Sequence, residues 1–141
     1  MSDLQHTVRD MFEAIDQRRF NALADYLDPA ITFTAPGGDG QGIAAVGEFL
    51  TPFLTALPAL THRLDTVAVA LDVVTVELTL VGTHTGPLHT PDGPLSATGA
   101  TIAWPCCHVY RFRAGKAVAN HLYFDRAELL AQLTAPSPAA V

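Results

Sequence analysis

The sequence predicts an α+β fold in which helices pack on one face of a curved, mostly antiparallel β-sheet. Two observations predict it: apolar residues recur with a helical period before Thr61 and with the period of a strand after it. The length of 141 residues corresponds to one average domain. We expect a single domain over residues 1–135, followed by a flexible Pro-, Ala- and Ser-rich tail over residues 136–141.

Each segment predicted to be helical carries one apolar stripe. In the first of them Val8 and Phe12 share a face, and Ser2 with Gln5 has the spacing of a capping box. Pro52 lies inside the third segment and should kink or interrupt it. The predicted helices span residues 3–17, 20–27, 43–57 and 126–133.

Alternating apolar and polar residues, bounded by turn signals, predict the strands. The turn signals lie near Leu71 and at Ala114-Gly115. Residues 36–40 and 86–99 are rich in glycine and proline and are predicted to be loops. The predicted strands span residues 31–35, 62–70, 73–84, 100–112 and 117–124.

Composition excludes several classes of protein. A chain with 49% hydrophobic and 16% charged residues is not disordered. A net charge of −6 without a Lys/Arg cluster argues against binding to nucleic acid or to an anionic membrane. No apolar run approaches the roughly 20 residues of a membrane span, and no secretory signal is visible. Adjacent Cys106 and Cys107 point to opposite faces of an extended chain, so we expect no disulfide and a cytoplasmic protein.

The register of the last hairpin decides which side chains share a face. A two-residue turn would need a positive φ at Ala114, which is unfavourable for alanine. A three-residue loop with a bulge at Gly115 pairs His108 with Asn120. The same register pairs Cys106 with Leu122 and Trp104 with Phe124. The alternative register, which would place His108 opposite His121, is less favourable.

In this register one face of the hairpin has the character of a lined pocket, with apolar walls and two polar residues side by side. His121 and Tyr123 then face the other way, toward solvent or an oligomer interface. Phe33 on the first strand is expected to add an apolar wall residue. The hairpin residues on the pocket face are Trp104, Cys106, His108, Tyr110, Phe112, Val118, Asn120, Leu122 and Phe124.

The order of elements and several short motifs resemble the SnoaL-like polyketide or ester cyclases of the nuclear transport factor two-like superfamily. The resembling pieces are Gly82-Thr83-His84-Thr85-Gly86, then Thr98-Gly99, the hairpin from His108 to Lys116, and Tyr123-Phe124-Asp125 before Leu129. The resemblance covers roughly residues 4–133. It is moderately specific when the first piece and the hairpin are taken together.

The resemblance implies a cone-shaped sheet wrapped around the N-terminal helices, with an internal cavity that opens at one end. It also implies a homodimer through the outer sheet face, a hydrophobic small-molecule ligand, and no metal or cofactor. Such cyclases remove a proton next to a carbonyl and guide an intramolecular aldol closure, with an acidic side chain on the last strand. The position that matches this acid by its distance from His108 is Leu122.

Four polar residues are candidates for the chemistry, and three of them, His108, His84 and Asp125, also have a structural alternative. His108, oriented by Asn120, is either a general base or a core histidine bonded to a carbonyl. His84 either binds substrate at the pocket mouth or anchors a loop. Asp125 is either catalytic or the cap of the last helix, since Glu128 follows at capping-box spacing. His84, His89, His108 and His121 are scattered and lack the close paired spacing of a zinc site.

Two functions follow from these residues. The first is a cofactor-independent enzyme that enolises an apolar carbonyl compound, with His108 transferring the proton and Asn120 or His84 donating a hydrogen bond. The alternative is a non-catalytic domain that binds a hydrophobic small molecule or acts as a dimerising accessory module. Leu122 in place of an acid favours the alternative.

Overall fold

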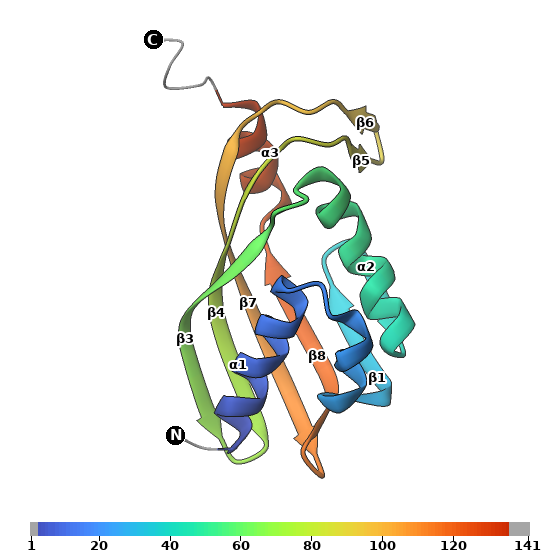
Figure 1. The fold of residues 1–141 in the computed structure, drawn as a ribbon, viewed down its shortest axis with the longest axis vertical. Coiled ribbons are helices and arrows are strands. Elements are labelled where there is room, and N and C mark those ends of the chain that lie inside the picture. The colour runs from blue at the N-terminus through green and yellow to red at the C-terminus, as the bar shows by residue number, and fades with distance from the viewer. Residues whose placement is uncertain (1–2, 136–141) are drawn as a thin grey trace.

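The computed structural model describes residues 3–135, and both Ser2 and the tail over residues 136–141 lie outside the described residues. Figure 1 shows a long, curved sheet with α1, α2 and the short helix between them on its concave side. The helix α3 follows the last strand and packs against β7. The helical elements are α1 (Asp3–Asp16), the 3-10 helix η1 (Phe20–Asp25), α2 (Ile43–Ala56) and α3 (Arg126–Thr134).

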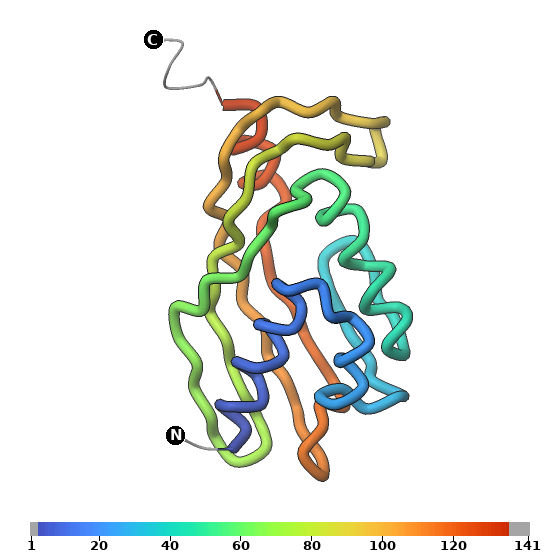
Figure 2. The backbone as a smooth tube through the Cα atoms, viewed as in Figure 1, coloured from blue at the N-terminus to red at the C-terminus, as the bar shows by residue number. Residues whose placement is uncertain are grey.

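The main sheet has six strands in the order β2-β1-β8-β7-β4-β3. This order leaves β2 and β3 as the edges of an open sheet, in which the pair β1 and β8 is parallel and the other neighbours are antiparallel. Its strands are β1 (Leu27–Ala35), β2 (Gly38–Gln41), β3 (Thr61–Ala70), β4 (Val73–Thr83), β7 (Thr101–Arg113) and β8 (Lys116–Phe124). A separate hairpin consists of β5 (Leu88–Thr90) and β6 (Gly93–Leu95). The tube in Figure 2 shows this hairpin extending away from the sheet, above α2.

The predicted α+β class is confirmed, and the differences concern short elements. The segment predicted to be helical up to Leu27 is a 3-10 helix that ends at Asp25, and Leu27 already pairs with Ala117 in the sheet. Both predicted loops contain short strands, β2 in the first and β5 with β6 in the second. Pairing with a neighbouring strand overrides the weak local preference of these glycine- and proline-rich segments. The helix α2 runs through Pro52 as one element.

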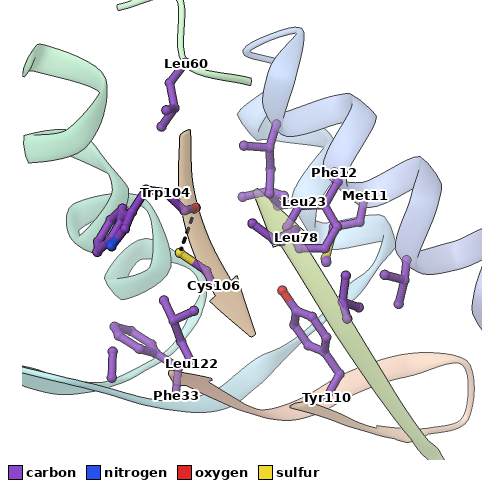
Figure 3. Close-up of a cluster of buried hydrophobic side chains, with 14 of the residues drawn as sticks. Met11, Phe12, Leu23, Phe33, Leu60, Leu78, Trp104, Cys106, Tyr110 and Leu122 are labelled. Atoms are coloured by element: carbon purple, nitrogen blue, oxygen red, sulfur yellow. Dashed lines mark hydrogen bonds between the residues drawn. The ribbon is translucent and has the colours of Figure 1, made fainter. Parts of the chain in front are cut away.

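The core lies between the helices and the concave face of the sheet. Val8, Met11, Phe12 and Ile15 of α1 are all at most 5% exposed, so the predicted stripe faces the sheet. Figure 3 shows Cys106, Tyr110 and Leu122 rising from the strands toward the helix layer. No helix in the described part of the chain is long and apolar enough to span a membrane.

The register of the last hairpin differs from the prediction. Ala114 does adopt a positive φ of 51° beside Gly115, and the two residues form the tight turn that was considered unfavourable. Phe112 pairs with Ala117, and Arg111 pairs with Ala119, so Val118 is left without a partner as a β-bulge. Beyond the bulge His108 lies opposite Leu122, not Asn120.

The predicted pocket face nevertheless holds from Asn120 onward, because the observed register differs from the predicted one by two residues there. A shift of two preserves the face on which each side chain points, whereas a shift of one reverses it. The other predicted pairs change as well: Cys106 lies opposite Phe124, which ends β8, so Trp104 lies beyond the paired part of the hairpin and pairs with Leu80 of β4 instead. Ala117, which was predicted to point away, is fully buried, and Val118 is only half-buried.

Candidate active site

A small cavity of about 60 Å³ lies between the concave face of the sheet and the helices α1 and α2. Its walls are mainly apolar and aromatic, and Phe33, Phe49 and Trp104 are among them. Gly40 makes room for one wall, since a side chain there would collide with the ring of Phe33. The residues predicted for the pocket that line this cavity are Phe33, Trp104, Cys106, His108, Tyr110, Asn120, Leu122 and Phe124.

His84 does not line this cavity and instead holds a loop. Its side chain is fully buried, and its Nδ1 accepts a hydrogen bond from the backbone N–H of Thr98 at 3.1 Å. Backbone bonds link the same residue to Ala100 and Gly99. Gly86, two residues later, packs so closely on Thr55 that a side chain would not fit. The Gly-Thr-His-Thr-Gly piece therefore fastens the end of α2 to the loop before β7.

Asp125 also lies outside the cavity lining and caps α3. Its Oδ1 accepts hydrogen bonds from the backbone N–H groups of Ala127 at 2.9 Å and Glu128 at 3.3 Å. These two N–H groups belong to the first turn, where a helix has no partners of its own. The carbonyl of Asp125 accepts a bond from the indole Nε1 of Trp104 at 2.9 Å. The residue thus positions the indole that lines the cavity, while its carboxylate serves the helix.

His108, Asn120 and Tyr110 form a polar group on the floor of the cavity. The Nδ1 of His108 lies 3.2 Å from Asn120 Oδ1 and 3.2 Å from the hydroxyl of Tyr110, whose ring is stacked on the imidazole. Burial lowers the pKa of His108 to about 3, although the Asn120 hydrogen bond opposes the shift, and nearby His62 lowers it further. His108 is therefore a neutral imidazole at physiological pH.

The second histidine of the cavity, His62 at the start of β3, was not among the candidates. Its Nδ1 lies 2.6 Å from Oδ1 of Asp16, the last residue of α1. The backbone N–H of His62 also donates to this carboxylate, at 3.0 Å to Oδ2. Because Nδ1 donates its proton to Asp16, the neutral ring has its lone pair on Nε2, which bonds to no described residue.

His62 was missed because β3 contains a bulge that simple alternation does not anticipate. Counted from the turn at Leu71, regular pairing would point Arg63 and Asp65 inward and His62 outward. Asp65 has no partner, since Thr66 pairs with Glu77 and Leu64 with Leu78. The bulge turns His62 toward the cavity. The sequence did contain a signal for the bulge, because regular alternation would place the charged residues Arg63 and Asp65 on the inward, apolar face of the strand.

Arg18 holds the helix end that carries Asp16 against the chain that leads to His62. Its guanidinium donates to the carbonyls of Ile15 and Asp16, at 3.0 and 3.3 Å. It also donates to the carbonyls of Pro58 and Leu60, both at 2.8 Å. Arg18 has a positive φ of 61°, the conformation common just after a helix. One side chain therefore joins the two segments from which the Asp16–His62 pair is built.

The cysteines do not present an activated nucleophile. Both are free thiols, as expected. Burial and the neighbouring Cys107 raise the pKa of the Cys106 thiol to about 12. Burial and Glu77 likewise raise the pKa of Cys107. Cys106 serves as a small apolar wall residue beside Trp104, and its Sγ lies 3.8 Å from the carbonyl oxygen of Trp104 (Figure 3).

Comparison with known proteins relates the chain to one family. A family model described as a SnoaL-like domain matches residues 8–120. No curated protein matches the chain. Solved structures under 25% identical to the chain share its fold.

A candidate SnoaL-like polyketide cyclase from Jannaschia sp. CCS1 has a TM-score of 0.82 and 17% identity, with 96% of this chain and 94% of that chain covered. IdmH, a candidate polyketide cyclase from Streptomyces antibioticus, has a TM-score of 0.81 and 19% identity, covering 94% and 99%. A candidate polyketide cyclase from Xanthomonas campestris pv. campestris has a TM-score of 0.75 and 21% identity, covering 94% and 97%. At these identities the likeness shows the fold and not the chemistry.

Proposed function

Because the chain belongs to the SnoaL-like domain family, we propose that it is a cofactor-independent cyclase or isomerase that enolises an apolar carbonyl compound. One observation carries the proposal: a histidine oriented by a carboxylate lines an apolar cavity in which a second, neutral histidine also lies. The sequence alone favoured His108 for the proton transfer. In this proposal His62 is the base, because its ring is hydrogen-bonded to a carboxylate whereas, among the described residues, the ring of His108 is not.

In the proposed first step Nε2 of His62 takes a proton from the carbon next to the substrate carbonyl. The electron pair of the broken C–H bond forms the enolate and places negative charge on the carbonyl oxygen. Asp16 accepts a hydrogen bond from Nδ1 of His62 throughout, so it fixes the ring and stabilises the imidazolium that forms. The side chain of His62 is only 4% exposed, which keeps water away from this proton.

His108 stabilises the enolate oxygen in this mechanism. The neutral ring has two tautomers: with its proton on Nδ1 it donates to Oδ1 of Asn120, and with its proton on Nε2 its Nδ1 accepts from the hydroxyl of Tyr110. In this mechanism the substrate selects the second tautomer, whose Nε2 donates to the substrate oxygen. A low pKa keeps the imidazole neutral, so it acts as a donor without competing for the substrate proton. A donor in a dry site of this kind contributes about 3–4 kcal/mol to the transition state.

The fate of the enolate distinguishes the two reaction types. In an isomerase, His62 returns the proton to a different carbon of the conjugated system. In a cyclase, the enolate carbon bonds to a second carbonyl carbon of the same molecule, and the proton on His62 passes to the alkoxide that results. Both routes balance without a further reactant.

Exchange of α-protons for deuterium in a series of methyl ketones tests the base. Wild-type protein should accelerate exchange from 2-butanone or a longer homologue in D₂O, followed by NMR. His62→Gln should slow the protein-dependent exchange by at least about 100-fold, since general base catalysis typically contributes 10²–10⁴. Asp16→Asn should slow it by a smaller factor, because the ring remains but loses its anionic partner.

His121→Gln is the matched control, since His121 is exposed on the outer face of the sheet. It should exchange protons at the wild-type rate. Circular dichroism of each variant establishes that the fold is retained. If His62→Gln exchanges protons as fast as the wild-type protein does, the assignment of the base is wrong.

One observation favours the non-catalytic alternative. Leu122 lines the cavity at the position that the resemblance matched to the family acid. On this alternative the domain binds an apolar small molecule without chemistry. The non-catalytic alternative is correct if wild-type protein binds ketones but does not accelerate their proton exchange above the rate in buffer.

A further inference from the structure

A second and larger hollow lies next to the inner cavity, and its volume is about 690 Å³. It is a groove between α2, α3 and the β5–β6 hairpin, which projects above α2 in Figure 1. Leu88 and Leu95 of the hairpin and Leu129 and Leu130 of α3 contribute apolar walls. Leu130 is 39% exposed, so its side chain is accessible to a molecule in the groove.

The groove and the inner cavity share part of their walls. Phe49 and Phe53, one helical turn apart on α2, line both of them and are half-buried. Their ring centroids lie 5.5 Å apart, and the ring of Phe53 lies 5.9 Å from that of Trp104 in the inner cavity. The wall between the two hollows thus consists of aromatic side chains, which can rotate about their single bonds.

The inner cavity alone is too small for a complete substrate. At about 60 Å³ it accommodates only a small group, whereas ligand sites commonly measure roughly 300–1,000 Å³. The groove reaches that range and continues the apolar character of the inner walls. A molecule that reaches His62 therefore has most of its body outside the inner cavity.

We propose that the ligand is an elongated carbonyl compound whose small carbonyl-bearing head occupies the inner cavity while its apolar body lies in the groove between α2, α3 and the β5–β6 hairpin. The identity of the head group as a carbonyl rests on the proposed function, whereas the placement of the apolar body rests on the size and the walls of the groove. Glu48, Asp92 and Arg126 stand along the groove with charges of both signs, so an uncharged body fits it better than an anionic or cationic one.

A chain-length series measures the contribution of the groove. Dissociation constants of methyl ketones from 2-butanone to 2-undecanone are determined by calorimetry with wild-type protein. Affinity should continue to rise by about three- to fourfold per added methylene after the head fills the inner cavity, as expected for burial of each CH₂ group. A rise that stops at the shortest ketones would overturn the proposal.

Leu130→Glu locates the body of the ligand. The glutamate places a charge on the groove wall at an already exposed position, so it should weaken the longest ketones by at least tenfold and leave 2-butanone unchanged. Leu71→Glu is the matched control, because Leu71 is 94% exposed at a distant turn, and it should bind as wild type does. Equal long-chain affinity in Leu130→Glu and Leu71→Glu would contradict the assignment.

The same series separates this proposal from the proposed function. His62→Gln should keep the chain-length dependence of binding while losing proton exchange. Wild-type protein that binds long ketones in the groove but exchanges no protons would remove the enolisation and keep the two-part ligand. If short and long ketones instead exchange protons equally fast at equal occupancy and bind with equal affinity, the enolisation stands and the two-part ligand is wrong.

Discussion

At His108 the surroundings of a single side chain determine its charge. The imidazole lies among Phe12, Tyr110 and Asn120, and burial in this group lowers its pKa to about 3. In the unfolded chain the pKa of a histidine is about 6.5. The folded protein therefore resists a proton that the unfolded chain accepts.

This difference in pKa makes stability depend on pH. Above about pH 6.5 His108 is neutral in both the folded and the unfolded state, so it does not make the free energy of unfolding depend on pH. Between about pH 6.5 and 3 the unfolded chain binds a proton that the folded protein does not, so the free energy of unfolding falls by up to about 1.4 kcal/mol per pH unit. Urea denaturation at several pH values should show this slope reduced in His108→Gln.

The control for this slope is His6→Gln, since His6 is exposed on α1 and lies in neither hollow. Its stability should follow that of wild-type protein across the same pH range. Identical slopes for His108→Gln and wild-type protein would mean that His108 takes up its proton in the folded state.

At the scale of elements, the site depends on how α1 is joined to the start of β3. Asp16 is the last residue of α1, and His62 lies at the start of the edge strand β3. Arg18 links these two segments by hydrogen bonds to four backbone carbonyls. The planar guanidinium can satisfy several acceptors at once, whereas a lysine ammonium is a compact point charge. The separation of Asp16 from His62 thus depends on a residue that lines neither hollow.

Arg18→Lys should loosen the pair while preserving the charge. We expect proton exchange to slow by about tenfold with little change in ketone affinity, since a misplaced catalytic group affects rate more than binding. The NMR signal of the Nδ1 proton of His62 should broaden or move upfield as its bond to Asp16 lengthens. Arg113→Lys, an exposed arginine at the β7–β8 hairpin, is the control. A wild-type signal in Arg18→Lys would show that Arg18 has no positioning role.

Much of the element layout could be predicted from sequence, because stripes such as that of α1 and alternation such as that of β4 are local patterns. Most of the pocket wall from Trp104 to Phe124 was predicted for the same reason. The bulges at Asp65 and Val118 were not predicted, because they depend on pairing between strands. His62 and its partner Asp16 were missed as a result, since they lie 46 positions apart and meet only in the folded chain.

Proteins with only 17% to 21% identity to this chain have the same fold. The concave face is covered by helices, whereas His121 and Tyr123 of β8 are exposed on the opposite face. His121 and Tyr123 lie there, and the hydroxyl of Tyr123 is 3.4 Å from Nδ1 of His121. Tyr123 is 56% exposed. The homodimer through this face stays a prediction.

Sedimentation equilibrium tests the dimer directly. Wild-type protein should have the mass of two chains at micromolar concentration. Tyr123→Lys should shift the mass toward one chain, because it replaces an exposed aromatic side chain on the predicted dimer face with a charge. Leu71→Lys, far from this face, should leave the mass unchanged. A wild-type protein that sediments as a single chain would refute the prediction.

The unpaired residues Asp65 and Val118 have a consequence for how this chain is compared with its relatives. Each strand carries one residue more than its partner needs, so a single deletion at either place would remove a bulge and leave the cavity-facing side chains where they are. The number of residues between a turn and the site is therefore free to differ between proteins that share the same geometry. Leu122 was matched to the family acid by counting residues from His108. Such counting compares positions along the sequence and not positions in space. Superposition of strands, residue by residue beyond each bulge, is the comparison that identifies corresponding groups.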